Sequence, residues 1–320
     1  MVKLKTPFAH LKNSKSLITP YENTRAGFVQ MALEKSSRAT PHVAQARDLA
    51  EQIKRAKKAL DLLKMDGIQG ALLTAAGISD KAVGHFDPAT HVETIQKLVE
   101  NYLVTSGAGF REELVYRFLL TRGDSLGGAM RNVVGVLAQR RFTSMLIARM
   151  RNSGLAFTYR TGNTKSWEPS STSNKLPDLE DIKYLAWQTN KGYRILAYNL
   201  KIASVGNNVD MSLVDCKTSD FSALILKDPK VFIALGELKG GIDPAGADEH
   251  WKTASTALSR IRSGFSKAKC KPKLFFIGAA IEQSMADEIW SFLGKQHLDN
   301  AANLTLDAHL SSICDWIVSL

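Results

Sequence analysis

The chain has 320 residues, 44% of them apolar, which is enough for one large or two modest folded domains. No apolar run reaches the length that a helix needs to cross a bilayer, and the first residues, Met-Val-Lys-Leu-Lys-Thr-Pro, lack the apolar core of a signal peptide. Three scattered cysteines, Cys216, Cys270 and Cys314, form neither a disulfide framework nor a CxxC metal motif. These features argue against a membrane-spanning or disulfide-stapled protein and predict a protein of the reducing cytoplasm.

The net charge is +11, and it is unevenly distributed. Residues 1–60 hold twelve Lys and Arg against four acidic residues, a surplus of +8. Such a field favours binding to nucleic acid or to an anionic membrane surface, although a solvated helix face accounts for it equally well. The basic stretch at 41–64 lacks the bulky aromatic face of interfacial helices, so a membrane role is remote.

Apolar residues at helical spacing predict a mostly helical region over residues 1–154. One helix is expected from Pro41 to Leu63, with Thr40 as the N-cap and Pro41 in the first turn. The other expected helices are Glu22–Ser36, Ala89–Tyr102, Phe110–Leu120 and Leu126–Met150, the last with a break.

Residues 155–320 have a different character, which predicts a second part of the chain. A short strand, Leu155–Arg160, precedes a polar run over 161–174 that reads as a loop. Further strands are expected at Tyr193–Tyr198, Val209–Val214, Val231–Lys239 and Leu274–Gly278, with helices at Pro244–Phe265, Gln283–Gly294 and Ala308–Val318. Strands interleaved with helices predict an α/β (α+β) core, in which helices flank a mixed central sheet. The expected division is therefore a helical part, 1–154, and an α/β part, 155–320.

The run from Val231 to His250 carries the strongest chemical signal. An apolar strand ends in Glu237-Leu-Lys239, and alternate residues of a strand share one face, so Glu237 and Lys239 can converge on one phosphate. Glu-x-Lys alone is common by chance, and a surface ion pair on an edge strand is the plain alternative. A second acid on a neighbouring strand would favour a nuclease site.

The segment Asn207–Asp215 offers two candidates for that second acid. Met211 and Leu213 share one face of this strand, which places Asp210 on the other, polar face. Asp215 falls in the apolar register at the strand end and is expected to cap or to face solvent. Asp210 and Glu237 would then offer hard carboxylate oxygens to Mg²⁺, and Lys239 would hold the attacking water or stabilise the transition state.

His250 lies two turns into the helix that follows the strand, where its ring could reach the same phosphate as a base or as a positioner of water. A lone helical histidine is as often without a function. Asp243 precedes Pro244, which is typical of a helix N-cap.

A glycine-rich segment over 121–132 also attracts attention, because it reads as the opening of a helix. An anion site at that helix start would place Arg122 or Arg131 on phosphate, whereas close helix packing at Gly127 and Gly128 is the alternative. Lys81, in Gly77–Ala82, could contact a base edge or the DNA backbone, although an exposed helix lysine is commoner.

Asp210, Glu237-Leu-Lys239 and the run Gly240–His250 together resemble the AvaI/BsoBI family of type II restriction endonucleases, within the PD-(D/E)xK nuclease superfamily. The segment 122–132 is similar to one shared by several restriction enzymes. The usual Pro-Asp arrangement at the first acid is absent here, so the assignment of Asp210 rests on strand register.

The resemblance implies a homodimer that cuts a short palindromic duplex in a Mg²⁺-dependent reaction, leaving 5′-phosphate ends. It implies catalytic roles for the residues at 210, 237 and 239 and for the histidine at 250. It also implies base-reading roles for Asp243 and Lys81. CYCGRG is the first guess for the target, and a cognate DNA methyltransferase is expected in the cell. The alternatives are a repair or recombination nuclease and a non-catalytic DNA-binding protein with a nuclease-like core.

Overall fold

The computed structural model describes residues 7–162, 164–170 and 176–320, with the side chain of Arg131 outside the described set. The chain forms two compact units, one made of the residues up to Phe28 together with Val134–Leu320, the other of Val29–Val133. These bounds differ from the division expected after residue 154. The reason is that the chain leaves and re-enters the first unit inside two long helices, α1 (Tyr21–Gln52) and α5 (Phe110–Asn152).

The unit Val29–Val133 is entirely helical in its regular structure. Between α1 and α5 it contains α2 (Gln69–Ala75), α3 (Asp80–Val83), α4 (Pro88–Leu98), a π turn (Val99–Leu103) and the 3-10 segments Ile53–Arg55, Ala59–Lys64 and Gly107–Gly109. Much of its described core is a buried apolar cluster, which includes Leu49, Ile53, Leu62, Leu72, Leu103 and Leu114. Apolar burial of this kind is the main source of stability for short helices.

The predicted start of a helix at Pro41 is wrong. Helix α1 runs without interruption from Tyr21 to Gln52, with Pro41 in its interior. Proline has no N–H to donate, which removes the helical hydrogen bond to the carbonyl of Ser37. The hydroxyl of the preceding Thr40 donates to the carbonyl of Ser36 at 3.2 Å, one turn back in the helix. The pattern Thr-Pro suits both a helix start and a kinked interior, so local sequence does not distinguish them.

The expected helix end at Leu120 and the expected break within Leu126–Met150 are also wrong, because α5 is one helix of 43 residues. The glycine-rich segment 121–132 therefore lies in a helix interior and offers no helix N-terminus to an anion. Close packing is not present either, since no described atom lies within 4 Å of a Cβ placed at Gly127 or Gly128. Each interior glycine costs about 1 kcal/mol, a cost that the buried side chains of α5, such as Phe142 and Leu146, outweigh.

The other unit is built on an eight-stranded sheet in the order β2-β1-β3-β4-β5-β6-β7-β8. The strands are β1 (Phe157–Thr161), β2 (Glu168–Pro169), β3 (Ile182–Thr189), β4 (Gly192–Ile202), β5 (Asn207–Val214), β6 (Phe232–Lys239), β7 (Lys273–Gly278) and β8 (Asn300–Asn303). Neighbours from β2 to β6 pair antiparallel, whereas β6, β7 and β8 pair parallel. The predicted mixed sheet is thus confirmed, with β2, β3 and β8 added to the five expected strands. Residues 163 and 171–174 of the expected loop, and residue 175 after it, lie outside the described residues.

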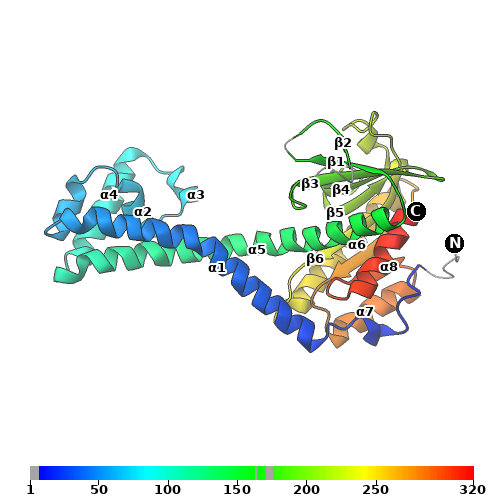
Figure 1. Ribbon diagram of the computed structural model, residues 1–320, viewed down its shortest axis with the longest axis horizontal. Helices are drawn as coiled ribbons and strands as arrows, with labels where there is room; N and C mark the ends of the chain where they lie inside the picture. Colours follow the sequence, from blue (N-terminus) through cyan, green and yellow to red (C-terminus); the bar gives the residue numbers. More distant parts are fainter. Residues whose placement is uncertain (1–6, 163, 171–175) are drawn as a thin grey trace. The chain divides into compact units, whose positions relative to one another are not determined.

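Helices cover both faces of this sheet (Figure 1). Consecutive residues of a strand point to opposite faces, and β7 shows which helix covers which face. Phe276 packs against Trp251 of α6 (Ala247–Lys267), with ring centroids 5.2 Å apart. Phe275 packs against Trp316 of α8 (Asp307–Ser319), at 5.8 Å. Helix α7 (Gln283–Gly294) lies on the α6 face, and the second half of α5 lies on the α8 face.

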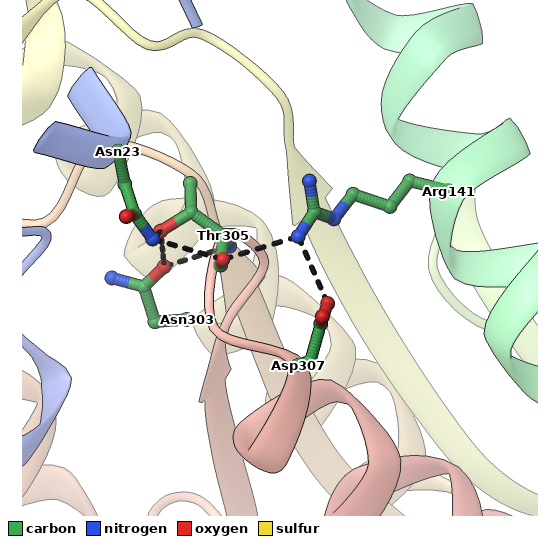
Figure 2. A network of polar contacts seen from close by, with 5 residues as sticks. All are labelled: Asn23, Arg141, Asn303, Thr305 and Asp307. Atoms are coloured by element: carbon green, nitrogen blue, oxygen red, sulfur yellow. Dashed lines mark hydrogen bonds and ion pairs between the residues drawn. The ribbon is translucent and has the colours of Figure 1, made fainter. Parts of the chain in front are cut away.

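Polar contacts tie the N-terminal segment to the ends of the parallel strands. The side chain of Asn303 donates to the carbonyl of Leu17 and to the hydroxyl of Thr19, both at 2.8 Å. Figure 2 shows the continuation of this network, in which Asn23 of α1 and Arg141 of α5 both donate to the carbonyl of Thr305. The first turn of α1 and the second half of α5 are therefore anchored where β8 ends.

Within the described residues, no helix combines the length and apolar character needed to span a bilayer. The three cysteines are free thiols, with Cys216 and Cys314 buried and Cys270 partly buried.

Stability should depend on pH through His309, which lies in α8 and is 8% exposed. Its Nδ1 accepts from the backbone N–H of Asn303 at 3.4 Å, and burial, reinforced by nearby His10, lowers the pKa of His309 to about 4. The folded pKa lies below the unfolded value of 6.5, so the stabilisation is complete above pH 6.5 and is lost as the pH falls toward 4.

We expect His309 to lower the free energy of unfolding by about 1–2 kcal/mol between about pH 7 and pH 5. Urea denaturation of the wild type and of His309→Asn at both pH values measures this, because an asparagine oxygen accepts the same hydrogen bond at either pH. Equal losses of stability in the two proteins would contradict the assignment.

Candidate active site

The register of two antiparallel strands brings the expected acids together. Met211 of β5 pairs with Gly236 of β6 at the end of their ladder, and Asp210 and Glu237 each come one residue beyond that pair. The backbone N–H of Leu238 donates to Oδ2 of Asp210 at 3.0 Å, which fixes the carboxylate against β6. Asp215, the rejected candidate, instead accepts from Arg194 at 3.1 Å.

Lys239 joins the two carboxylates. Its Nζ donates to Oδ2 of Asp210 at 3.0 Å and to Oε2 of Glu237 at 2.8 Å. The side chain of Glu237 is only 4% exposed, whereas Lys239 is 19% and Asp210 30% exposed. The cluster therefore sits at the sheet surface with one deeply buried carboxylate and an accessible side at Asp210.

The charges in this cluster shift one another's pKa values. Burial raises the pKa of Glu237 to about 7, and the negative charge of Asp210 acts in the same direction, while the Lys239 ammonium opposes both. Burial also acts to lower the pKa of Lys239, but attraction by Glu237 and Asp210 outweighs it and raises that pKa above its ordinary value. Lys239 is therefore a cation at neutral pH, and two acids share its single positive charge.

The oxygen donors fit a divalent cation such as Mg²⁺. One or two carboxylates suffice for Mg²⁺, because water and substrate phosphate complete its shell. No cluster of three or more His, Cys, Asp or Glu side chains that could hold a metal occurs among the described residues, so a closed structural metal site is not formed there. Asp210 and Glu237 are the residues that would hold the ion.

The imidazole of His250 lies against Gly241, which follows the end of β6. A Cβ added to Gly241, two residues beyond Lys239, would lie 2.2 Å from Nε2 of His250, so the imidazole occupies the space that any side chain at 241 would need. His250 forms no hydrogen bond with Asp210, Glu237 or Lys239 in this structure. The ring is thus seated on the loop that leaves β6, beside the cluster and separate from it.

Two helices hold this loop in place by close backbone approach. A Cβ at Gly240 would lie 2.6 Å from the carbonyl oxygen of Val134 in α5, and a Cβ at Gly27 in α1 would lie 2.3 Å from the side chain of Ile242. The carbonyl of Lys239 also accepts from the N–H of Ala279 at 2.9 Å. The glycine pair after β6 therefore permits the packing that positions His250.

Asp243 is the N-cap of a 3-10 turn, Pro244–Gly246, that precedes α6. Its carboxylate accepts from the N–H of Ala245 at 3.0 Å, and the residue is exposed. The capping role expected from the sequence is therefore present, and the exposed side chain remains accessible to a ligand.

The other candidate DNA-binding residues belong to the helical unit. Lys81 is exposed in α3, and Arg122 of α5 forms an ion pair with the neighbouring Asp80. Arg131 is also in α5, and its side chain lies outside the described residues. The structure thus brings Asp210, Glu237 and Lys239 together, whereas Lys81, Arg122 and Arg131 lie in a different unit.

Sequence reasoning missed Asn199, which is exposed and has a left-handed backbone with φ of 52°. Its neighbours Tyr198 and Leu200 pair with Met211 and Val209, so Asn199 lies across from Asp210. Asparagine is among the residues that tolerate this conformation, and strained backbone concentrates at functional sites. The sequence pattern that could have indicated this residue is a single asparagine within an otherwise apolar strand segment.

A mixed sheet with helices on both faces, carrying two acids and a lysine where strands end, defines a nuclease core of the PD-(D/E)xK class. A family model described as restriction endonuclease BsobI matches residues 8–320. The chain is 46% identical over 315 residues to the type II restriction enzymes AvaI of Nostoc sp. and of Anabaena variabilis, which covers 97% of this chain and 98% of each relative. It is 43% identical over 316 residues to BsoBI of Geobacillus stearothermophilus, covering 97% of both chains. The chain therefore belongs to the BsoBI family of type II restriction endonucleases.

Proposed function

We propose that this protein is a homodimer that hydrolyses both strands of a short palindromic DNA duplex in a Mg²⁺-dependent reaction. The observation that carries the proposal is the cluster of Asp210, Glu237 and Lys239 in a chain of the BsoBI family. Two-fold symmetry would present two such sites to the two strands of a palindrome.

In the proposed reaction, water attacks phosphorus as the bond from phosphorus to the 3′ oxygen breaks. The products are a 5′-phosphate and a 3′-hydroxyl, with the leaving oxygen taking up a proton. Asp210 and Glu237 would hold Mg²⁺, which when bound lowers the pKa of water and neutralises charge that develops on the phosphate. Lys239 would polarise the attacking water or stabilise the transition state.

His250 would act as a base or would position the attacking water, because its ring lies against Gly241, two residues after Lys239. Asp243, exposed at the start of the same helical segment, would accept from cytosine N4 in the major groove. Lys81 would donate to guanine O6 and N7.

Arg122 and Arg131 would bind backbone phosphates. For Arg122 this requires exchange of its present partner Asp80 for a phosphate, so we expect it to contribute less than an unpaired arginine. The proposed target is CYCGRG, and a cognate methyltransferase would protect the same sequence in the host. The proposed substrate places the enzyme in the cytoplasm.

Digestion of a sequenced phage or plasmid DNA tests the proposal directly. We expect discrete fragments with identical 5′-phosphorylated ends when Mg²⁺ is present and no cleavage when EDTA removes the ion. Sequencing of the ends gives the recognition site and the cut position together. Smeared products would indicate a structure-directed or non-specific nuclease, and cleavage in EDTA would overturn the metal assignment.

A further inference from the structure

Arg160 in β1 lies in a cage of aromatic rings. Its guanidinium carbon is 4.1 Å from the centroid of Tyr184, 5.3 Å from that of Trp167 and 5.4 Å from that of Phe221. The three rings meet edge to face, with centroids 5.1 to 6.1 Å apart, and they pack against the core under α6. The guanidinium therefore lies over three aromatic rings that pack against one another.

Arg160 has no carboxylate partner among the described residues. Among the partly or fully buried arginines of this unit, Arg149 pairs with Asp315 and Arg194 with Asp215. Arg262 also forms no ion pair among the described residues, but no aromatic ring lies under its guanidinium there. An aromatic ring attracts a guanidinium that lies over its face. The N–H groups at the edge of the guanidinium stay free to donate to an anion that lies in the guanidinium plane. A half-buried positive charge with unused donors is a site that an external phosphate oxygen would satisfy.

The cage shares a sheet face with the candidate active site. Residues that pair across neighbouring strands share one face of a sheet. One such row crosses from β1 to β6 and consists of Arg160, Tyr184, Ala197, Ser212 and Leu235. Asp210 and Glu237 come two residues from Ser212 and Leu235 in their strands, so they occupy that same face.

The distance between Arg160 and Asp210 would allow both residues to contact the same DNA duplex. Three strand spacings of about 4.8 Å and a two-residue offset of about 7 Å put the backbone of Arg160 roughly 16 Å from that of Asp210. Successive base pairs rise by about 3.4 Å, so roughly 16 Å is half a helical turn or less. A duplex whose scissile phosphate lies at Asp210 and Glu237 would present other phosphates at this range.

We propose that Arg160, held by Trp167, Tyr184 and Phe221, binds a backbone phosphate of duplex DNA and so positions the substrate beside the active site. The inference rests on the proposed action on duplex DNA. Arg160 is a positioning residue, because it lies too far from the cluster to touch the reacting phosphate. Phosphate contacts orient a protein on DNA without reading sequence, so Arg160 contributes affinity that falls with salt.

The test compares salt dependence of binding in Arg160→Met, Arg160→Lys and Arg151→Met. Methionine keeps apolar cover over the rings and removes the charge, and Arg151 is an exposed arginine at the end of α5 that supplies the matched charge loss. Anisotropy of a fluorescein-labelled duplex in EDTA gives the dissociation constant at several salt concentrations. Thermal unfolding of each variant reports on the fold.

For Arg160→Met we expect about five- to tenfold weaker binding at low salt and a slope of log K against log salt reduced by about 0.9, with Arg160→Lys restoring the slope. KM for cleavage should rise with kcat unchanged. An unchanged slope, or the same reduction in Arg151→Met, would overturn the role of Arg160. Absence of duplex binding by the wild type would instead overturn the proposed function.

A measurement on the wild-type protein covers the case in which Arg160→Met does not fold. Phenylglyoxal modifies accessible arginines, and mass spectrometry locates the adducts. We expect duplex DNA to protect Arg160 and to leave Arg151 reactive. Equal modification of Arg160 with and without duplex would overturn the proposal.

Discussion

Lys239→Ala and Glu237→Ala should bind duplex DNA and cut it at least roughly 10³-fold more slowly than the wild type. Lys239 is the only cation in contact with both carboxylates in the described structure, and Glu237 is the more buried of the two proposed metal ligands. Removing either changes the charge that faces the scissile phosphate and leaves the remote DNA contacts intact. Single-turnover cleavage, with binding measured separately in Ca²⁺ or EDTA, separates the two effects.

Lys273→Ala is the matched control, because Lys273 is an exposed lysine at the start of β7. It lies away from the cluster, and its ion pair among the described residues is with Asp299. We expect its cleavage rate to equal that of the wild type. Lys239→Ala should also unfold more easily, since it leaves two carboxylates without their shared cation, whereas Glu237→Gln removes the repulsion with Asp210 and should stay folded. Cleavage at the wild-type rate by Lys239→Ala or Glu237→Ala would contradict the catalytic roles proposed for these residues.

Gly241→Ala should slow cleavage about ten- to a hundredfold with little loss of stability. The added Cβ would lie 2.2 Å from Nε2 of His250, so the imidazole must move, whereas φ at 241 does not require glycine. His250→Ala should slow cleavage about 10²-fold or more if the ring serves as a base or positions water. The measurement is kcat on a defined duplex, with the unfolding midpoint alongside.

Gly246→Ala provides the control for that experiment. A Cβ at Gly246 would lie 3.5 Å from the same nitrogen of His250, an ordinary contact, so this variant adds the same methyl group without displacing the ring. We expect wild-type cleavage from it. The proposed role of His250 fails if His250→Ala cuts at the wild-type rate, and the steric argument fails if Gly241→Ala and Gly246→Ala behave alike.

The strand that carries Glu237 and Lys239 was predictable because its signal is local. An apolar run of strand length with Glu and Lys at alternate positions sets both the structure and the shared face. Strand register also separated Asp210 from Asp215, and the structure pairs Asp210 with Lys239 and Asp215 with Arg194.

The helices of the first half were predicted with wrong ends because their signals are ambiguous. Pro41 and the glycines near 127 normally mark helix boundaries, yet both lie inside continuous helices. Their local cost is a few kcal/mol at most. Buried side chains along α5 outweigh the cost of its glycines, whereas α1 buries only Ala46 and Leu49 and continues through Pro41 with an exposed surface. Strand β8 was missed for the opposite reason, since Asn300 and Asn303 have little β-propensity and gain their place from buried hydrogen bonds.

The sequence alone determined which reactive groups are present: the acid and lysine at alternate positions, the glycine pair followed by a histidine, and the surplus of basic residues. It also determined the alternation of strand and helix segments that forms a mixed sheet. These depend on neighbours within a few residues, where periodicity and side-chain type suffice. Only the tertiary structure decided which groups meet. Strand pairing across β5 and β6 places Asp210 on Lys239, close helix packing seats the loop of His250, and the row from β1 to β6 sets Arg160 on the same face. Such contacts join residues far apart in the chain, and burial shared among many side chains fixes them.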